Sequence, residues 1–190
     1  QGKGTFVNVD SLNIKVTFSP VVEFARMMCD SGYQPGVKNL GVSYYTARQG
    51  EEIRKKLLLA EEEPLVAVER AFLADGTICA YTVDIFPRQM LGSGNFSDLR
   101  SYEKSVYEFL YAQTGRRILW DKIDLNVVNA GEIPGYALHL RDAFERERPL
   151  LYIQGTNYDE NDLPIMYSLE YIDTRVIQFS VIRQRKIQYK

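Results

Sequence analysis

Histidine, cysteine and long apolar runs are scarce in this chain of 190 residues, and each scarcity excludes a class of protein. No apolar run approaches the length that a bilayer-spanning helix needs, and no signal peptide opens the sequence. The two cysteines, Cys29 and Cys79, lie in separate predicted elements, so we expect two buried free thiols and no disulfide. Unpaired thiols favour a reducing compartment, and we expect a cytoplasmic protein.

The sequence offers little material for catalysis or for metal binding. His139 is the only histidine and lies in a helical pattern, and no serine, aspartate or cysteine arrangement can be tied to it. We interpret it as a structural or surface residue. The acidic turn at 159–162 lacks the glycine and the glutamate that a calcium-binding loop requires at fixed positions, so we predict a solvated turn. No metal site and no cofactor is predicted.

The charge balance argues against direct binding of nucleic acid. Lysine and arginine number 23 against 25 acidic residues, which gives a formal net charge of -2 and a pI of about 5.6. A domain that grips nucleic acid by itself usually shows an excess of basic residues. The length suits one ordinary domain with a full hydrophobic core.

Helical and strand-like patterns alternate along the chain. Ser19 and Pro20 suit the start of a helix that Gly32 ends. Asp75 and Gly76 separate two strand-like runs, which is a strong hairpin signal. The remaining predicted helices cover 51–59, about 101–113 and 136–144, and the predicted strands cover 37–47, 65–73, 78–86, 116–130, 150–158, 163–173 and 176–189. Because hairpins join the strands, we predict an α+β fold on an antiparallel sheet.

The first residues of the chain read as the end of a missing element. Gly2 to Val7 spells Gly-Lys-Gly-Thr-Phe-Val, a tight turn that runs into a strand, with no first strand and no initiator methionine before it. We therefore expect a C-terminal fragment of a longer protein. The expected division is a remnant of a wing and linker at 1–10, followed by a single domain at 11–190.

Several short motifs, in order, resemble one known family. The wing-like start is followed by Phe18-Ser19-Pro20 before a helix, and by pieces at 70–76, 85–87, 105–107, 149–151, 158–159 and 164–168. Together they resemble the effector-binding (UTRA) domain of GntR-type transcription regulators of the HutC branch. The resemblance implies a chorismate-lyase-like α+β fold, a homodimer, an internal pocket for a small effector, and DNA binding only through an absent winged-helix domain.

The resemblance also implies a set of ligand-binding residues. They are the positions that match the family's pocket motifs: Ser19, Arg70, Phe72, Thr82, Ser105, Tyr107 and Met166. The helix start at Ser19 and the guanidinium of Arg70 both suit an anion. The family's second arginine is Phe72 here, and glutamates of some members are Thr82 and Met166. We therefore expect an effector that is less polar than a phosphosugar and carries at most a single negative charge.

Two other functions stay open at this stage. The same fold supports a lyase or hydrolase, and a purely structural dimerisation domain would need no cavity. The leading interpretation predicts a hollow beside the Asp-Gly hairpin. It also predicts that the apolar run at 176–189 helps to bury a dimer interface or a core face.

Overall fold

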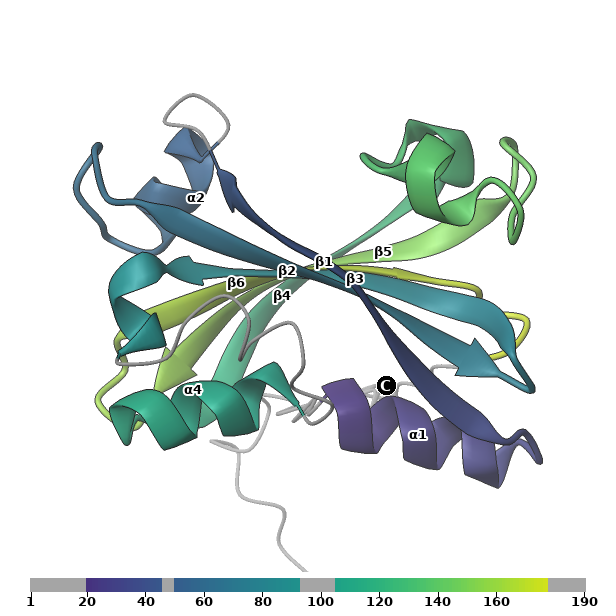
Figure 1. Ribbon diagram of the computed structural model, residues 1–190, viewed down its shortest axis with the longest axis horizontal. Helices are drawn as coiled ribbons and strands as arrows, with labels where there is room; N and C mark the ends of the chain where they lie inside the picture. Colours follow the sequence, from purple (N-terminus) through teal and green to yellow (C-terminus); the bar gives the residue numbers. More distant parts are fainter. Residues whose placement is uncertain (1–19, 46–49, 93–104, 178–190) are drawn as a thin grey trace, which may run out of the picture.

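The computed structural model describes residues 20–45, 50–92 and 105–177, and these form one antiparallel sheet with helices on both faces (Figure 1). The six strands lie in the order β1-β2-β3-β6-β5-β4. Their bounds are Pro35–Tyr45 (β1), Leu65–Ala74 (β2), Thr77–Pro87 (β3), Ile118–Asn129 (β4), Pro149–Asp159 (β5) and Pro164–Ile172 (β6). The predicted α+β fold on an antiparallel sheet is confirmed.

The helices fall into two groups, one on each face of the sheet (Figure 1). On one face lie the long helices α1 (Pro20–Asp30) and α4 (Val106–Thr114), together with the short 3-10 turn η2 (Arg88–Leu91). On the other face lie α2 (Glu51–Lys56) and the segment that holds the turn η3 (Ala130–Glu132) and the π-helical turn η4 (Tyr136–Leu140). We call these the α1/α4 face and the α2/η4 face.

The Asp-Gly hairpin forms as predicted between β2 and β3. Asp75 and Gly76 both adopt positive φ angles, 48° and 81°, which is the backbone of the tight turns that match the twist of paired strands. The carboxylate of Asp75 also accepts a hydrogen bond from the backbone N–H of Gln34 at 2.8 Å. This contact ties the turn to the residue that precedes β1.

The two central strands are buried on both faces, whereas the edge strand β4 is largely exposed. Every residue of β3 from Cys79 to Pro87 is buried, and β2 is nearly as enclosed. Such strands read as continuous apolar runs, because helices cover both sides. On β4, by contrast, the side chains of Leu119, Leu125 and Val127 are more than half exposed.

On the α1/α4 face the core is divided into two clusters. Under α1, Phe24 and Met28 pack on Phe72 and on neighbours from β3, β5 and β6. Under α4, Phe109 and Leu110 pack on apolar residues of β2, β3 and β6. The two helices thus cover opposite ends of the strands and leave the middle of the sheet between them.

Three details correct or refine the sequence-based expectations. Cys79 is a buried free thiol, but Cys29 is exposed, because it lies one position beyond Met28 and so points off the buried stripe of α1. The apolar pattern at 51–59 predicts Ile53, Leu57 and Leu58 as the inner stripe of the helix; Ile53 and Leu57 are buried, but Leu58 is 78% exposed. α2 ends before Leu58, whose positive φ of 55° turns its side chain outward.

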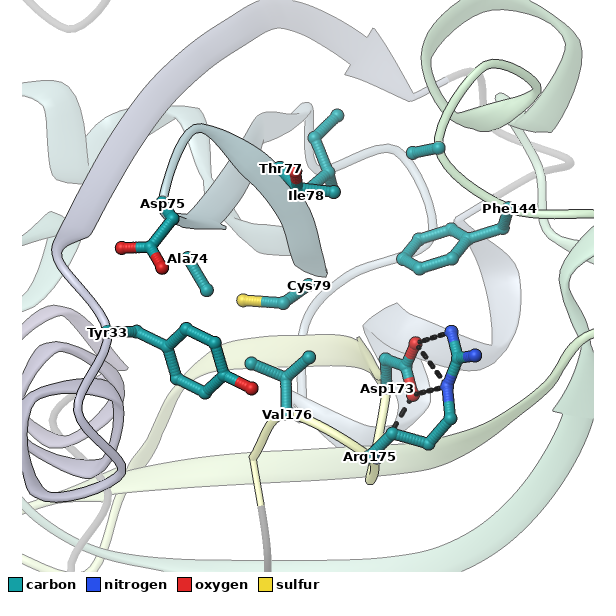
Figure 2. Close-up of a pocket in the computed structure, with 11 residues that line it drawn as sticks. Tyr33, Ala74, Asp75, Thr77, Ile78, Cys79, Phe144, Asp173, Arg175 and Val176 are labelled. Atoms are coloured by element: carbon teal, nitrogen blue, oxygen red, sulfur yellow. Dashed lines mark hydrogen bonds and ion pairs between the residues drawn. The ribbon is translucent and has the colours of Figure 1, made fainter.

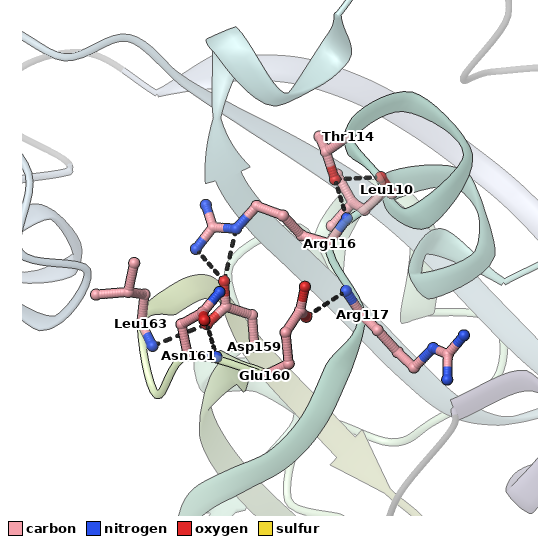
Figure 3. A network of polar contacts seen from close by, with 8 residues as sticks. All are labelled: Leu110, Thr114, Arg116, Arg117, Asp159, Glu160, Asn161 and Leu163. Carbon is pink, nitrogen blue, oxygen red and sulfur yellow. Dashed lines mark hydrogen bonds and ion pairs between the residues drawn. The ribbon is translucent and has the colours of Figure 1, made fainter.

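The acidic turn after β5 is held by its own first residue (Figure 3). One carboxylate oxygen of Asp159 accepts hydrogen bonds from the backbone N–H groups of Asn161 and Leu163, both at 2.9 Å. The other oxygen pairs with the guanidinium of Arg116 at 2.6 Å. The turn is confirmed, but Asp159 itself is buried rather than solvated. These contacts, together with the backbone hydrogen bonds, hold the pKa of Asp159 below its ordinary value despite its burial.

Several predictions lie outside the described residues. They concern the wing and linker at 1–10, the cap at Ser19, and all but the first two residues of the run 176–189. The start of the predicted helix at 101–104 also lies outside; the described part of that helix begins at Val106. In the part of the chain that the structure describes, no helix is both long enough and apolar enough to span a membrane.

Candidate functional site

A row of polar side chains, all buried except the half-buried Asp121, crosses the middle of the sheet on the α1/α4 face, between the two apolar clusters. We call it the polar strip. Strand register brings its members together: Arg70 lies opposite Thr82, Thr82 opposite Glu170, and Asp84 opposite Ser168. The strip comprises Arg70 of β2, Thr82 and Asp84 of β3, Ser168 and Glu170 of β6, Asn157 of β5 and Asp121 of β4. Alternation along each strand places all of them on one face.

An ion pair forms one end of the polar strip. The guanidinium Nη2 of Arg70 lies 2.8 Å from Oδ2 of Asp84, and each side chain is only 1% exposed. The guanidinium also lies 5.7 Å from the ring centre of Phe72, two residues along β2. Burial of two charges is tolerated when each neutralises the other, whereas loss of one partner is strongly destabilising. Arg70 is therefore a buried ion-paired residue and not a solvated one.

Tyr107 connects α4 to the strip through a chain of hydrogen bonds. Its hydroxyl donates to Oδ1 of Asn157 at 3.0 Å, and Nδ2 of Asn157 donates to Oγ of Ser168 at 3.0 Å and to the carbonyl of Met166 at 3.3 Å. Burial raises the pKa of Tyr107, and the carboxyl groups of Asp84, Glu170 and Asp121 raise it further. Tyr107 therefore stays protonated and acts as a donor.

Ser105 serves as the cap of α4. Its hydroxyl accepts a hydrogen bond from the backbone N–H of Tyr107 at 3.1 Å, and its own backbone N–H donates to Glu108 at 3.3 Å. This reciprocal arrangement is a capping box, which satisfies two N–H groups that the helix leaves unpaired. The cap fixes the start of α4 and hence the position of Tyr107.

Three oxygens of the polar strip have no hydrogen-bond partner among the described residues. They are Oγ1 of Thr82, Oδ1 of Asp84 and Oε2 of Glu170, and all three side chains are at least nine-tenths buried. A buried acceptor that accepts nothing costs about 1–3 kcal/mol. Such atoms are rare in folded proteins, and each one calls for an explanation such as a ligand or a functional role.

Two carboxyl groups of the strip, those of Glu170 and Asp121, have a raised pKa. Burial raises the pKa of Glu170 to about 8, the nearby carboxyl groups of Asp84 and Asp121 add to the shift, and Arg70 opposes it. Burial likewise raises the pKa of Asp121 to about 6. Perturbed carboxyl groups that lie next to a buried ion pair are typical of functional sites.

Two small residues, Gly155 and Ser168, lie in the sheet beside these carboxyl groups. A Cβ placed on Gly155 of β5 would lie 3.6 Å from Ile123, 3.8 Å from Oδ2 of Asp121 and 3.9 Å from Nδ2 of Asn157. Its neighbour across the sheet is Ser168, also a small residue. Glycine inside a strand often marks a place where a ligand approaches the backbone closely.

The structure therefore gathers some of the predicted ligand-binding residues and separates others. Arg70, Thr82 and Tyr107 meet at the polar strip, while the hydroxyl of Ser105 is engaged as a helix cap. Phe72 and Met166 lie on the same face but in the two apolar clusters that flank the strip, and Ser19 lies outside the described residues. Their assignment as ligand contacts stays a prediction.

Sequence reasoning missed the acidic side of the strip. Alternation along the predicted strand at 78–86 puts Asp84 on the same face as Thr82, but the sequence suggests no role for Glu170, Asn157 or Asp121. A signal exists in β6, where Ser168 and Glu170 alternate with apolar residues in a buried strand. What the sequence could not supply is the pairing of β3 with β6, which sets Glu170 beside Thr82.

A hollow does lie beside the Asp-Gly hairpin, but it is separate from the strip (Figure 2). This pocket of about 310 Å³ is lined near the turn by Ala74, Asp75 and Thr77 and on its other side by Phe144, Asp173 and Arg175. Asp173 and Arg175 form an ion pair with each other, as the dashed lines in Figure 2 show. None of the predicted ligand-binding residues that the structure describes lines it.

A second pocket opens on the α2/η4 face. It has a volume of about 360 Å³, and most of its lining is aromatic or apolar. Glu69 at its wall accepts a hydrogen bond from the hydroxyl of Tyr81 at 2.7 Å and lies 3.4 Å from Nε2 of His139. His139 is thus placed on the face opposite the polar strip, and its described contacts are structural.

Comparison with known proteins identifies the family. The UTRA domain profile matches residues 30–178. No curated protein sequence matches the chain. Among solved structures, the ligand-binding domain of a putative GntR-family transcriptional regulator from Bordetella bronchiseptica is similar, with a TM-score of 0.68 and 18% identity over 80% of this chain and 90% of that one.

Two further structures show the same fold. PhnF from Mycobacterium smegmatis aligns with a TM-score of 0.68 and 18% identity over 90% of this chain and 71% of that one. The C-terminal domain of YurK from Bacillus subtilis aligns with a TM-score of 0.65 and 21% identity over 77% of this chain and 95% of that one. The family match covers most of the sequence and the fold agrees with it, so this chain belongs to the UTRA domain family.

Proposed function

We propose that this domain senses a small molecule for a GntR-type transcription regulator and that the polar strip is where the effector binds. The observation that carries the proposal is the set of three buried oxygens without partners, on Thr82, Asp84 and Glu170. A domain without a ligand retains this unfavourable arrangement, and a bound molecule that supplies hydrogen-bond donors relieves it. Binding is therefore coupled to the stability of this part of the sheet.

The position of the strip between α1 and α4 suggests how binding reaches a DNA-binding domain. Phe24 of α1 packs edge-on against Phe72, with ring centres 4.9 Å apart, and Phe72 lies two residues from Arg70. A ligand at Arg70 and Tyr107 therefore acts on both helices. Residues 1–10, which we predict to be wing and linker, precede α1, so a shift of α1 is the expected route to the winged-helix domain of a cytoplasmic regulator.

A homodimer completes the proposal, because effector binding has to reposition two DNA-binding domains. The exposed apolar side chains of Leu125 and Val127 on the edge strand β4 support it, since unpaired edges with apolar residues favour association. In sedimentation experiments we expect Val127→Lys to dissociate the dimer. Leu138→Lys, which alters an equally exposed leucine on η4, is expected to leave the dimer intact. A wild-type monomer at micromolar concentration would contradict this part.

We propose that the domain is not an enzyme. The single histidine contacts Glu69 on the opposite face and does not approach Arg70 or Thr82. The polar strip holds an ion pair and carboxyl groups but no Ser-His or Cys-His pair among its members. Its features suit recognition of a molecule, and nothing favours turnover of one.

The test is to look for a retained molecule and then to disturb its contacts. Native mass spectrometry of protein purified gently from cells is expected to show bound small molecules that denaturation releases. Re-addition to the stripped protein is expected to raise Tm, and Thr82→Val and Tyr107→Phe are expected to weaken binding about tenfold each. Tyr171→Phe, on the α2/η4 face, is the matched control. Unchanged binding by both variants would refute the assignment of the strip.

A further inference from the structure

We infer that the effector carries a protonated nitrogen, an ammonium or guanidinium group, which binds among the carboxyl groups of Asp84, Asp121 and Glu170. This inference rests on the proposed function, because it names the chemical class of ligand for the same site. It departs from the anionic effector that the sequence suggests. Three separate observations carry it: the charges of the strip, its hydrogen-bonding capacity and the apolar side chain of Ile123 beside Asp121.

The charges of the polar strip are unbalanced. Arg70 is its only cationic member, and Asp84 pairs with Arg70 at 2.8 Å. Asp121 and Glu170 bring two further carboxyl groups to the same face, and no cationic member of the strip pairs with either of them. Once these two carboxyl groups are ionised, a purely anionic ligand would add to the negative charge, whereas a cationic ligand compensates it. The existing pair also engages Nη2 of Arg70, a group that an anion would otherwise use.

The hydrogen-bonding groups point to the same conclusion. The side-chain donors of Tyr107 and Asn157 are already used within the strip. The oxygens of the strip without a partner among the described residues are Oδ1 of Asp84, Oε2 of Glu170 and Oγ1 of Thr82. Because an ionised carboxylate only accepts, a ligand that pairs with Asp84 and with deprotonated Glu170 has to donate. An ammonium group has three donors and no acceptor, and a guanidinium has five, so either satisfies carboxylate oxygens and supplies charge.

Two features favour an organic cation over a metal ion. No group of three His, Cys, Asp or Glu side chains in the described part of the chain is placed to hold a metal ion. A Cβ placed on Gly155 would touch both Ile123 and Oδ2 of Asp121, so an apolar side chain lies beside this carboxyl group, which suits the carbon part of an organic cation.

Glu170 makes binding dependent on pH. Its carboxyl group faces Arg70 of β2, Asp84 of β3 and Asp121 of β4, and Tyr107 of α4 senses its charge. With a pKa of about 8, Glu170 is largely protonated at neutral pH and has to lose its proton to pair with a cation. The affinity for a cation is therefore expected to rise about tenfold per pH unit up to about pH 8 and then to level off.

The experiment uses three probes that share a four-carbon chain: putrescine with two ammonium groups, butanediol with two hydroxyls and succinate with two carboxylates. Isothermal titration and thermal shifts are measured on the whole chain at millimolar probe, from pH 6 to pH 9. We expect putrescine to bind and to raise Tm, with binding that strengthens toward pH 8. Butanediol and succinate are expected to produce no shift.

Two variants separate this site from nonspecific attraction of cations. Glu170→Gln keeps the shape of the side chain, and we expect it to weaken putrescine binding at least tenfold at pH 8.5 and to abolish the pH dependence. Glu69→Gln, which changes a carboxylate on the other face of β2, is expected to leave both unchanged.

Two outcomes would overturn the inference. One is that butanediol or succinate raises Tm more than putrescine does. The other is that none of the three probes binds or changes Tm. In either case the proposed sensing function is judged separately by the retained molecule. A neutral or anionic molecule in purified protein, bound through Thr82 and Tyr107, would refute the cationic ligand and support the sensor. Absence of any retained or rebinding molecule would refute both.

Discussion

The two faces of the same sheet follow opposite rules. On the α2/η4 face, Tyr81, Tyr171 and Tyr152 form a stacked row, with ring centres 5.8 Å and 4.8 Å apart, and the hydroxyl of Tyr81 donates to Glu69. On the α1/α4 face, every oxygen that is buried without a partner among the described side chains lies in the polar strip. The α2/η4 face is therefore packed for stability, whereas the α1/α4 face contains, in the polar strip, buried oxygens that lower the stability.

This difference between the two faces indicates which face carries the functional site. Neighbouring residues of a strand point to opposite faces, so Glu69 and Arg70 are adjacent in sequence but belong to different environments. Buried polar atoms without a hydrogen-bond partner occur in proteins mainly at functional sites. Among the described residues, the oxygens of this kind lie only in the polar strip, while the clusters on either side of it are apolar.

The largest effect is expected from breaking the buried ion pair. Asp84→Ala leaves the guanidinium of Arg70 buried without its counter-charge, and we expect it to lower the free energy of unfolding by about 3–5 kcal/mol. Urea denaturation measures the change. Glu51→Ala removes an exposed partner of Lys55 on α2 and is expected to change the free energy of unfolding far less, because solvent screens this pair. Equal losses in both variants would show that the Arg70–Asp84 pair is not special.

A second prediction applies the same substitution to each face. Glu170→Gln removes a carboxyl group from an unfavourable site, and we expect it to raise the free energy of unfolding by about 1–2 kcal/mol at pH 8.5. Glu69→Gln weakens the hydrogen bond from Tyr81 and is expected to lower the free energy of unfolding by about 1 kcal/mol. Chemical denaturation of both variants measures these changes. A lower free energy of unfolding in Glu170→Gln would refute the contrast between the faces.

The pH dependence of stability follows from the raised pKa of Glu170. The folded protein holds this proton up to about pH 8, whereas the unfolded chain releases it near the ordinary value for glutamate. The folded state thus binds more protons in that interval, so stability is expected to fall as the pH rises from about 5 to 8. Asp121 contributes in the same direction up to about pH 6. Denaturation across this range should show the slope in wild type and a weaker slope in Glu170→Gln.

A third prediction concerns the hydroxyl of Thr82. Because Oγ1 has no partner among the described residues, Thr82→Val keeps the shape and removes a buried polar atom. We expect a gain of about 1 kcal/mol in the free energy of unfolding together with weaker effector binding. Calorimetry gives the first quantity and titration with the retained molecule the second. Loss of stability would mean that the hydroxyl is satisfied in the native protein.

The smallest effect on stability is expected at Gly155. An added Cβ meets its neighbours at ordinary van der Waals distances, so Gly155→Ala should gain about 0.5 kcal/mol, because alanine loses less conformational entropy. Gly155→Ala should nevertheless weaken effector binding, since the added methyl group lies beside Oδ2 of Asp121. Gly41→Ala on the edge strand β1, where nothing lies near the added Cβ, is the control. Titration of both variants with the retained molecule tests this, and unchanged binding in Gly155→Ala would show that the ligand lies elsewhere.

Much of the fold was predictable from local patterns. The Asp75-Gly76 turn, the stop of α1 at Gly32 and the cap of α4 at Gly115 all follow from residues that tolerate positive φ. The strands β2 and β3 followed from apolar runs on either side of that turn. Errors arose where exposure depends on a single residue at the end of an element, as for Cys29 and Leu58.

The candidate site was predictable only in part. Arg70, Thr82 and Tyr107 were found through the family resemblance, and alternation places Arg70 on the same strand face as Phe72 and Thr82 on the same face as Asp84. Their acidic neighbours come from strands that are distant in sequence: Glu170 reaches Thr82 only because β6 pairs with β3. The sequence around a carboxyl group in an apolar strand does not indicate which residue of the neighbouring strand will lie opposite it.

The sequence alone determined the family and the Asp-Gly hairpin, and it also determined which side chains of a strand share a face. These features depend on local backbone preferences and on the period of two residues along a strand. Only the tertiary structure decided that the β3–β6 and β4–β5–β6 pairings bring Asp84, Asp121 and Glu170 to the side of Arg70. Strand register is a long-range property, set by how whole faces are buried. The charge balance of the site, and therefore the kind of molecule it admits, is fixed by that register.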